Sequence, residues 1–383
     1  MSWEKVPIKD VCEGIYDGPH ATPPLSESGA IFLGIQNFKN GRLDFSDVRY
    51  ISEEDLLIWT KRVIPQAGDI VFSYEATLNL YAIIPAGFRG CLGRRMALIR
   101  VDKNKINYRY LYYYLHSPTW KAVIAENTVT GATVDRIPLI RFPDFEIELP
   151  PLDVQNNIAD ILSAYDDLIE NNQRQIKLLE EAAMRLYREW FVFMRFPGHE
   201  SVRIEDGVPE GWEKIRTSSV MKFNYGKGLL EANRSGDGYP VFGSSGIVGY
   251  HDTPLVNENC IVVGRKGNVG SVYLSLMPSY PIDTVFYIIP KINIYYCYFE
   301  LKSRTFVNND SAVPGLNREN VEDMPMLLPS DKILEGFHNL IDPYIQRMSY
   351  LEQQNVLLQK ARDALLPRLM NGGEGLKLEG GAV

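Results

Sequence analysis

The feature that most constrains the fold of this chain is a heptad pattern that occurs twice. In the first copy, mostly apolar residues recur at alternating steps of four and three along residues 158–190, as in the seam of a coiled coil. The same spacing returns 179 positions later, along residues 337–369. One Asn interrupts each seam, Asn172 in the first and Asn355 in the second. Two such helices in one chain are predicted to pair with each other.

Each helix follows a block that is rich in Gly, aromatic and β-branched residues and ends in Leu-Pro. The blocks echo each other, since Trp212-Glu-Lys-Ile repeats the pattern of Trp3-Glu-Lys-Val. Residues 69–74, 96–101 and 141–149 are predicted as strands and 108–116 as a helix. The expected fold class is therefore α+β, with two strand-rich domains alternating with two long helices that pair as an antiparallel coiled coil around a pseudo-two-fold axis. The expected domains are residues 1–150, 151–200 (first helix), 201–330, and 331–383 (second helix and a flexible tail).

An antiparallel pairing with Asn172 opposite Asn355 gives every seam residue a seam partner. The paired stretch would then be about 48 Å long, at ~1.5 Å per residue. The other expected pairs are Ile158 with Leu369, Trp190 with Phe337, Tyr165 with Arg362, and Ala183 with Tyr344.

Composition excludes several classes of protein. The net charge of −8 argues against a protein that coats DNA without sequence preference, although local basic patches remain compatible with site-specific binding. No apolar run approaches the ~20 residues of a membrane span, and the N-terminus has no signal-peptide core, so we expect a cytoplasmic protein without a membrane partner. The four cysteines are scattered, which favours reduced thiols and no metal site.

Catalytic motifs are missing as well. The sequence has no phosphate loop, no HExxH, no Asn- or Asp-Pro-Pro-Tyr methyltransferase signature and no GxSxG elbow, so we do not expect an enzyme. One alternative is a free-standing Mg²⁺-dependent nuclease that uses Asp283, Glu300 and Lys302. A structural role for Glu300 is favoured, because Tyr114 takes its place in the first block. The other alternative is a coiled-coil scaffold with two protein-binding heads.

Several segments in this order resemble the specificity (S) subunit of type I restriction–modification systems. They are Pro209-Glu-Gly-Trp, Arg188-Glu-Trp-Phe-Val-Phe-Met-Arg-Phe-Pro-Gly, Tyr239-Pro-Val-Phe-Gly-Ser-Ser-Gly and Leu365-Leu-Pro-Arg-Leu-Met-Asn-Gly. The resemblance covers nearly the whole chain, including its order of block, helix, block and helix.

The resemblance implies that each block is a target-recognition domain that reads one half of a split sequence in double-stranded DNA. The helices would act as a spacer and dock two methyltransferase (M) subunits, and two restriction (R) subunits would join for cleavage. This chain would hold no cofactor, since S-adenosylmethionine belongs to the M subunits and ATP to the R subunits. Half-sites about one DNA turn apart, roughly 34–36 Å, would leave an unread spacer of about six or seven base pairs.

Candidate DNA contacts in the second block are side chains with hydrogen-bonding groups on Gly-rich turns. A guanidinium fork or paired donors on such a turn suit base edges, and glycines allow the backbone close to phosphate. A solvated hairpin turn is the alternative for Gly264–Gly267 and Gly243–Gly246. The candidates are Tyr225, Lys227, Ser244, Ser245, Arg265, Lys266, Asn317 and Arg318.

The first block offers a similar set on its turns. Asp17-Gly18-Pro19 is a strong turn by itself, and an Asp that stabilises the turn is as good an interpretation as a functional one. Gln36 and Asn37 suit adenine or, alternatively, the capping of a turn. Arg136 lies near the position that Arg318 has in the second block. The candidates are Tyr16, His20, Thr22, Gln36, Asn37, Lys39, Arg94, Thr133 and Arg136.

Overall fold

A computed structural model describes residues 3–130, 134–306 and 315–371 of the chain. Its fold is mixed α+β, as the sequence predicts. The chain divides into two compact units, which are Met1–Glu170 with Asn355–Val383 (unit 1) and Asn171–Gln354 (unit 2). Each unit therefore combines one strand-rich block with a stretch of both long helices. The predicted flexible tail after Asn371 lies outside the described residues, as does Thr133.

Unit 1 is built on a four-stranded antiparallel sheet in the order β2 (Cys12–Asp17), β10 (Met96–Val101), β7 (Ile70–Ser73) and β8 (Tyr81–Ile83). The central strands β7 and β10 are almost entirely buried, because both faces of the sheet are covered. A three-stranded sheet orders β6 (Arg49–Ile51), β3 (Ala30–Phe32) and β9 (Gly90–Cys91), with β3 and β9 parallel. The remaining strands pair as β1 (Glu4–Pro7) with β11 (Glu146–Leu149), and β4 (Phe38–Lys39) with β5 (Arg42–Leu43).

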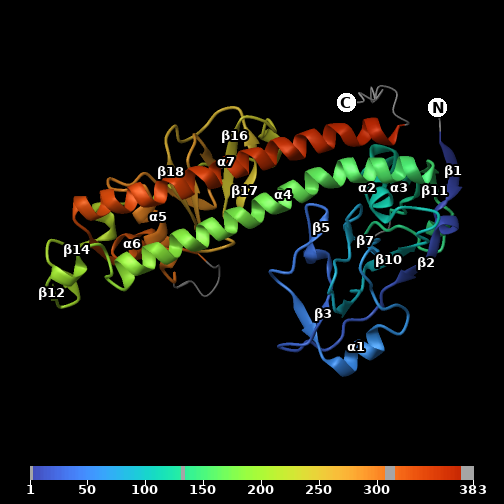
Figure 1. Cartoon of the computed structure of the whole chain (residues 1–383), viewed down its shortest axis with the longest axis horizontal. Helices are drawn as coiled ribbons and strands as arrows, with labels where there is room; N and C mark the ends of the chain where they lie inside the picture. The colour runs from blue at the N-terminus through green and yellow to red at the C-terminus, as the bar shows by residue number, and fades with distance from the viewer. Residues whose placement is uncertain (1–2, 131–133, 307–314, 372–383) are drawn as a thin grey trace, which may run out of the picture. The chain divides into compact units, whose positions relative to one another are not determined.

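The helices of unit 1 lie at two places around these sheets. α2 (Tyr108–His116) and α3 (Pro118–Asn127) lie near the long helices, whereas α1 (Glu53–Trp59) lies far from them, beyond β3 (Figure 1). Tyr110 and Tyr112–Tyr114 of α2 are buried in the core, and Trp120 of α3 donates its indole N–H to Tyr81 at 2.8 Å. Single 3-10 turns lie at Ile8–Val11, Ile35–Asn37 and Phe142–Asp144.

Unit 2 repeats this architecture. Its four-stranded sheet orders β15 (Asn224–Tyr225), β21 (Val285–Ile288), β18 (Cys260–Gly264) and β19 (Val272–Ser275). Its three-stranded sheet orders β17 (Gly246–His251), β16 (Tyr239–Gly243) and β20 (Tyr280–Pro281), again with one parallel pair. The closing pair is β14 (Glu213–Arg216) with β22 (Pro325–Leu328). The other elements are α5 (Ile294–Ser303), α6 (Arg318–Glu322), the hairpin of β12 (Ile204–Glu205) with β13 (Val208–Pro209), and 3-10 turns at His199–Ser201, Thr217–Ser219 and Glu231–Asn233.

Hydrogen bonds show that the two blocks match residue by residue. The side-chain oxygen of Asn107 caps α2, and that of Asn293 caps α5 in the same way. Tyr110 donates to the carbonyl of Glu148 in the closing strand of unit 1, and its counterpart Tyr296 donates to Leu327 in unit 2. The repeat therefore reaches into the packing of the core and is more than a likeness of composition.

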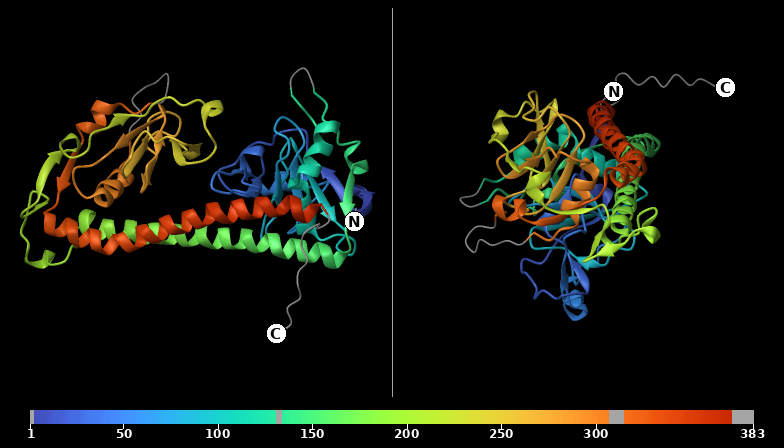
Figure 2. Two further views of the ribbon diagram at one scale, coloured as in Figure 1. Left: turned by 90° about the horizontal axis from the view of Figure 1, so that it is seen from above. Right: turned by 90° about the vertical axis from the view of Figure 1, so that its left-hand side faces the viewer.

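The long helices are α4 (Leu152–Tyr187) and α7 (Asp331–Met370), and their stretches lie side by side within each unit (Figures 1 and 2). In unit 1, Ile158 and Leu162 of α4 share a core with Leu365 and Leu369 of α7. In unit 2, the rings of Trp190 and Phe337 have centroids 5.8 Å apart. In unit 1, the N-terminal part of α4 thus meets the C-terminal part of α7. In unit 2, the end of the first helix meets the N-terminal part of α7. Both contacts agree with the predicted antiparallel register.

Polar side chains of the two helices bond each other close to the predicted register. Asn172 donates to Gln354, the residue before Asn355, at 2.9 Å. Arg362, expected opposite Tyr165, bonds the buried carboxylate of the next residue, Asp166, at 2.5 Å. Tyr344, expected opposite Ala183, is 37% exposed, and its neighbour Ile345 is buried. Arg362 selects Asp166 as its partner because polar side chains pair by hydrogen bonding as well as by heptad position.

The first long helix ends in a π-helical turn over Arg188–Val192. Such turns are rare and often lie at functional or strained sites. Here the turn places Trp190 and Phe191 in the core of unit 2 and leaves Val192 and Phe193 about half exposed, at 51% and 56%. Met194 then takes a left-handed conformation with φ of 57°, which turns the chain out of the helix before the predicted stop at Pro197.

Among the described residues, no helix is both long and apolar enough to cross a membrane.

The aromatic core of unit 2 gives a test of how the helices support the blocks. Phe337 of α7 is fully buried, and its ring centroid lies 4.9 Å from that of Phe191 and 6.4 Å from that of Phe299 in α5. We expect Phe337→Ala to lower the free energy of unfolding by about 3–5 kcal/mol, because it leaves a cavity among aromatic rings. Urea denaturation of the full chain would measure this. Leu340→Ala, at a position that is 48% exposed, should change it by less than about 0.5 kcal/mol.

Candidate nucleic-acid interface

In unit 2 the candidate site begins with the turn that follows β18, and its backbone is fixed on two sides. The N–H groups of Arg265 and Lys266 both donate to the carbonyl of Thr284, at 2.9 and 3.1 Å. The carbonyl of Arg265 accepts from Leu316 at 2.9 Å. Two cationic side chains thus project from a rigid backbone, which lowers the entropy lost when they bind a ligand.

The guanidinium group of Arg265 is also held in place. Its Nη2 donates to the carbonyl of Asp283 at 2.8 Å. Its carbon lies 5.2 Å from the ring centroid of Tyr225 and 5.9 Å from that of Phe286, within cation–π range. A guanidinium has five N–H donors; Nε of Arg265 is buried, and the Nη donors other than the one to Asp283 remain for a ligand.

Arg318 approaches the same Tyr225 ring from another segment. Its guanidinium carbon lies 6.0 Å from the ring centroid, and its Nε bonds Glu322 at 2.9 Å. Its neighbour Asn317 caps α6, with its side-chain oxygen accepting from Glu319 and Asn320. This capping role argues against Asn317 as a base contact, because its acceptor is already used.

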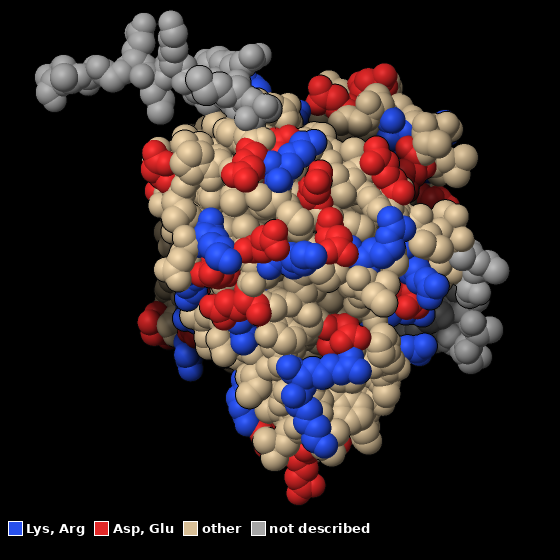
Figure 3. Space-filling model, turned by 90° about the vertical axis from the view of Figure 1, so that its right-hand side faces the viewer, with Lys and Arg blue, Asp and Glu red and all other residues tan. Residues whose placement is uncertain are grey.

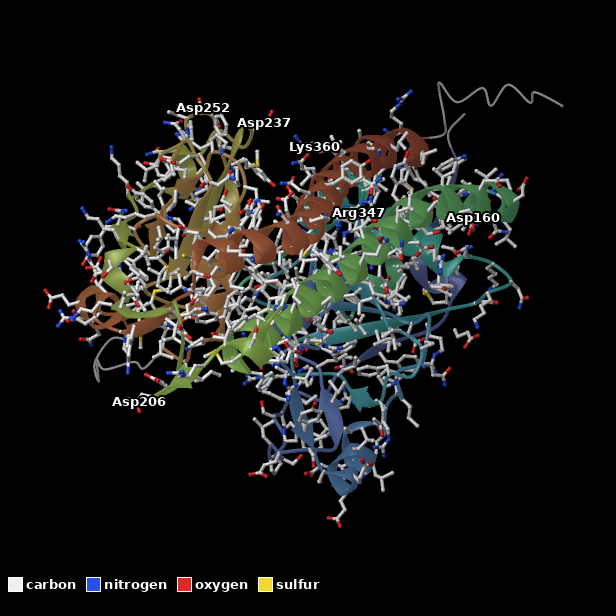
Figure 4. The ribbon with its side chains drawn as sticks, turned by 60° about the vertical axis from the view of Figure 1, so that its left-hand side comes forward. Asp160, Asp206, Asp237, Asp252, Arg347 and Lys360 are labelled. Carbon is white, nitrogen blue, oxygen red and sulfur yellow. The ribbon has the colours of Figure 1, made fainter. Side chains whose placement is uncertain are left out.

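The loop between β16 and β17 completes this side of unit 2. The oxygen of the Ser244 side chain accepts from the backbone N–H of Asn268 at 3.3 Å, which joins this loop to the Arg265 turn. Ser245 and Lys227 are exposed. At the opposite, open end of the hairpin, Figure 4 shows Asp237 and Asp252 near each other. Because carboxylates repel phosphates, the Ser244 end of the hairpin suits DNA better than the acidic end.

The equivalent edge of unit 1 carries a different network. Asp17, at the end of β2, pairs with Arg62 and lies 3.0 Å from Nε2 of His20. The hydroxyl of Tyr74 donates to the carbonyl of Arg94 at 3.1 Å and lies 3.4 Å from Nδ1 of His20. Burial, the largest cause, and the charge of Asp17 raise the pKa of Tyr74, so it stays a neutral donor at physiological pH. Asp17 thus organises charged groups here, beyond shaping its turn.

Two further arginines, Arg95 and Arg136, contact Glu75 beside this network. Arg95 forms an ion pair with Glu75 at 3.4 Å, and Glu75 forms a β-bridge with Arg136. The matching bridge in unit 2 joins Lys266 to Gly315. Arg136 therefore corresponds to Gly315, three positions before Arg318, near which the sequence places it. Arg62 also belongs to this cluster of charged side chains. The sequence does not predict this, because nothing in the local sequence of Arg62 marks it as a neighbour of Asp17.

The remaining candidates of unit 1 divide into exposed and structural residues. Thr22 is exposed, and Gln36, also exposed, lies 3.5 Å from Arg49. Lys39 bonds Asp44 at 3.2 Å on the small hairpin of β4 and β5. Asn37 is buried, accepts from the N–H of Gly34 and donates to the carbonyls of Asp44 and Asp47, which argues against a contact with adenine. Tyr16 is partly buried against the core, which favours a packing role.

The residues of the nuclease alternative do not form one site. Glu300 bonds Arg304 at 2.6 Å and the hydroxyl of Tyr187, and Lys302 pairs with Glu180 of α4. In the described part of the chain, no group of three or more His, Cys, Asp or Glu side chains is placed to hold a metal ion. Glu300 and Lys302 therefore belong to the packing of α5.

Charges of both signs are mixed on the face that Figure 3 shows, where Lys and Arg are interspersed with Asp and Glu and neither sign gathers over a large area. A mixed face of this kind does not favour binding along any stretch of DNA.

Comparison with known proteins identifies the class of these two matched units. The family model "Type I restriction modification DNA specificity domain" matches residues 1–181 and 209–354, which is most of the chain. The chain belongs to this family, the DNA specificity subunits of type I restriction–modification systems.

Relatives and a solved structure agree with this assignment. The chain is 25% identical over 362 residues to the type I restriction enzyme MjaIX specificity subunit of Methanocaldococcus jannaschii, covering 85% of this chain and 81% of that one. It is 21% identical over 337 residues to the HindI specificity subunit of Haemophilus influenzae, covering 65% and 73%. The crystal structure of a type I restriction–modification S subunit from M. genitalium shares the fold, with a TM-score of 0.55, 17% identity and coverage of 97% and 96%.

The fixed guanidinium of Arg265 leads to a prediction about DNA binding. We expect Arg265→Ala to weaken binding while the chain still folds. A bidentate contact to guanine would cost about 1–3 kcal/mol and relax one base position, whereas a phosphate contact would lower affinity evenly across sequences. Binding to a pool of randomised duplexes would distinguish the two. Arg216→Ala is the control, since Arg216 is an exposed arginine of the same unit that pairs with Asp323 at 3.2 Å. Equal affinities of the unaltered chain and both variants would reject both contacts.

Proposed function

We propose that this chain reads a bipartite target in double-stranded DNA, with one half-site for each unit and an unread spacer between the half-sites. The observation that carries the proposal is the recurrence of one loop cluster on one sheet edge in both units, with different side chains. A shared scaffold with divergent loops is what separate recognition of two sequences requires. The recognition domains of the proposal are residues 1–150 and 201–330, and the helices are residues 151–200 and 331–383.

The chain acts in this proposal as a non-catalytic subunit in the cytoplasm. Two M subunits dock on the helices and supply S-adenosylmethionine, and two R subunits join them and supply the ATP-dependent step. Apolar side chains that face away from the seam support the docking of partners, namely Leu168 and Leu178 of α4 and Leu357 of α7, which are 52%, 59% and 67% exposed. An assay of the purified chain with Mg²⁺ and no partner tests the nuclease alternative, since cleavage would contradict the proposal.

The paired helices set the length of the unread spacer in this proposal. Support comes from the pairing within unit 2, where Asn172 donates to Gln354 and the Trp190 and Phe337 rings have centroids 5.8 Å apart. A continuous helix is a stiff element that gains ~1.5 Å for each residue. A change of helix length therefore alters the distance over which the half-sites are read.

Exchange of one block tests the modular part of the proposal. Replacing residues 211–329 with the corresponding block of a relative should change one half of the methylated sequence and leave the other half and the spacer unchanged, because the loop cluster of unit 1 is retained. Methylated bases mapped in genomic DNA from cells that carry the hybrid, with the unchanged gene as control, measure this. A change in both halves contradicts separate half-sites.

A matched insertion tests the spacer. One turn of four residues after Arg174 and one after Gln353, which face each other in the predicted register, should lengthen the helices by ~6 Å. We expect both half-sites to be kept and the spacer to gain one or two base pairs, at about 3.4 Å per base pair. Mapping of methylated bases gives the spacer directly. Four residues inserted instead between Asp206 and Gly207, in the turn of the β12–β13 hairpin, should leave the spacer unchanged. An unchanged spacer in an active double insertion contradicts the ruler.

A further inference from the structure

The sheet ladders show which residues occupy equivalent places in the two loop clusters. In unit 1, Tyr74 follows β7 and its carbonyl accepts from Ile137 at 2.7 Å, as that of Arg265 accepts from Leu316 in unit 2. Asp17 pairs with Ala97 across the first sheet, as Tyr225 pairs with Phe286 across the second. Arg265 of unit 2 therefore takes the place of Tyr74 in unit 1. Tyr225 of unit 2 takes the place of Asp17.

Tyr225 lies at the centre of the cluster in unit 2. Its side chain is 54% exposed, and its ring centroid lies 5.1 Å from that of Phe286 in the sheet. The guanidinium carbons of Arg265 and Arg318 lie 5.2 and 6.0 Å from the Tyr225 ring. One exposed ring, supported from the sheet, thus contacts two cations that come from different loops.

The charges around this ring are not balanced. Arg318 has a carboxylate partner in Glu322 at 2.9 Å. Among the described residues, the polar partner of the Arg265 guanidinium is the neutral carbonyl of Asp283. In the cluster of unit 1, by contrast, Asp17 and Glu75 are both paired with arginines. The excess positive charge and free N–H donors at Arg265 call for an acceptor from outside the chain.

We infer that Tyr225 is a positioning residue that holds the Arg265 fork for a guanine in the half-site read by unit 2. The inference rests on the proposed function and deepens it. The O6 and N7 atoms of guanine form the acceptor pair in the major groove that fits a guanidinium fork. The Tyr225 ring and the Asp283 carbonyl restrict the plane and the direction of the fork, and such restriction separates a base contact from a loose phosphate contact.

The same comparison excludes this mode of recognition in unit 1. The residue equivalent to Arg265 is Tyr74, which is buried at 5% exposure and bonds the Arg94 carbonyl. The residue equivalent to Tyr225 is Asp17, an acceptor that is already paired. A guanine read from this position of the sheet thus belongs to the half-site of unit 2 alone.

Paired substitutions at Tyr225 test the positioning role. The chain is combined with the M subunit of its own system and used to methylate a library of duplexes in which both half-sites are randomised. We expect Tyr225→Leu to reduce the preference for guanine at one position about tenfold, because the fork loses its platform. Tyr225→Phe should keep the preference, since a phenyl ring still carries the cation. Arg265→Lys should lose it while keeping the charge.

Control measurements separate these effects from folding. Phe193→Leu removes a similar pair in the same unit, because Phe193 is 56% exposed and Arg195 lies 5.6 Å from its ring centroid, and it should not change any base preference. The melting temperature of each variant should match that of the unaltered chain, because the rings of Tyr225 and Phe193 are both exposed.

Three results would overturn the inference. An even loss of methylation over all sequences in Tyr225→Leu would assign Arg265 to phosphate. Equal losses in the Phe and Leu variants would make the Tyr225 hydroxyl itself a DNA contact. An unchanged preference in Tyr225→Leu would remove the ring from recognition. Failure of the proposed function is distinguishable from all three, because the unaltered chain would then show no preference in either half-site.

Discussion

The structure depends on hydrogen bonds from tyrosines of each block to carboxylates of the long helices. In unit 1, Tyr113 of α2 donates to Asp166 of α4 at 2.6 Å, and the same carboxylate binds Arg362 of α7. In unit 2, Tyr298 of α5 donates to Glu180 of α4 at 2.8 Å, and Tyr295 donates to Asp342 of α7 at 2.7 Å. Removing one partner from such a buried polar group costs more than the bond contributes, so these contacts fix where a block sits on its own stretch of helix.

The charge balance at Glu180 shows how this arrangement is maintained. Burial works to raise the pKa of Glu180, but the hydrogen bond and the charge of Lys302 outweigh it and leave the pKa below its ordinary value. The carboxylate therefore stays ionised at neutral pH and accepts from both Lys302 and Tyr298. Glu300 and Lys302, the nuclease candidates of the Tyr-rich helix, thus help to attach the second block to α4, through Tyr187 and Glu180. Catalytic-looking residue types are poor guides where their partners are distant in the sequence.

The sequence predicts features that depend on local or periodic patterns, and it does not predict contacts between segments that are far apart in the chain. The heptad seams, the strands β7 and β10, the helix α2 and the repeat of the two blocks are local or periodic patterns, and all of them are present. The cluster of Asp17, His20 and Arg62 joins segments 45 positions apart, and no local pattern predicts it. The same limit applies to the bond between Asn172 and Gln354, which joins residues 182 positions apart. It also explains Asn37, whose side chain serves loop carbonyls that its own sequence context does not reveal.

Divergent recognition on a common scaffold requires loop positions that do not depend on their side chains, and the backbone of these units meets that requirement. Gly18 and Gly226 occupy equivalent places, and a Cβ atom would lie 2.4 Å from the Gly93 carbonyl oxygen at the first and 2.0 Å from that of Ile282 at the second. The backbone bonds of Tyr74 and Arg265 are likewise the same in both units. The side chains at the positions of Tyr74 and Arg265 can therefore differ without a change of fold. Because the chain as a whole has a net charge of −8, the few cations so placed contribute discrimination more than affinity. In the proposed function, most of the affinity for the DNA backbone would then come from partner subunits, which would couple target recognition to assembly of the complex.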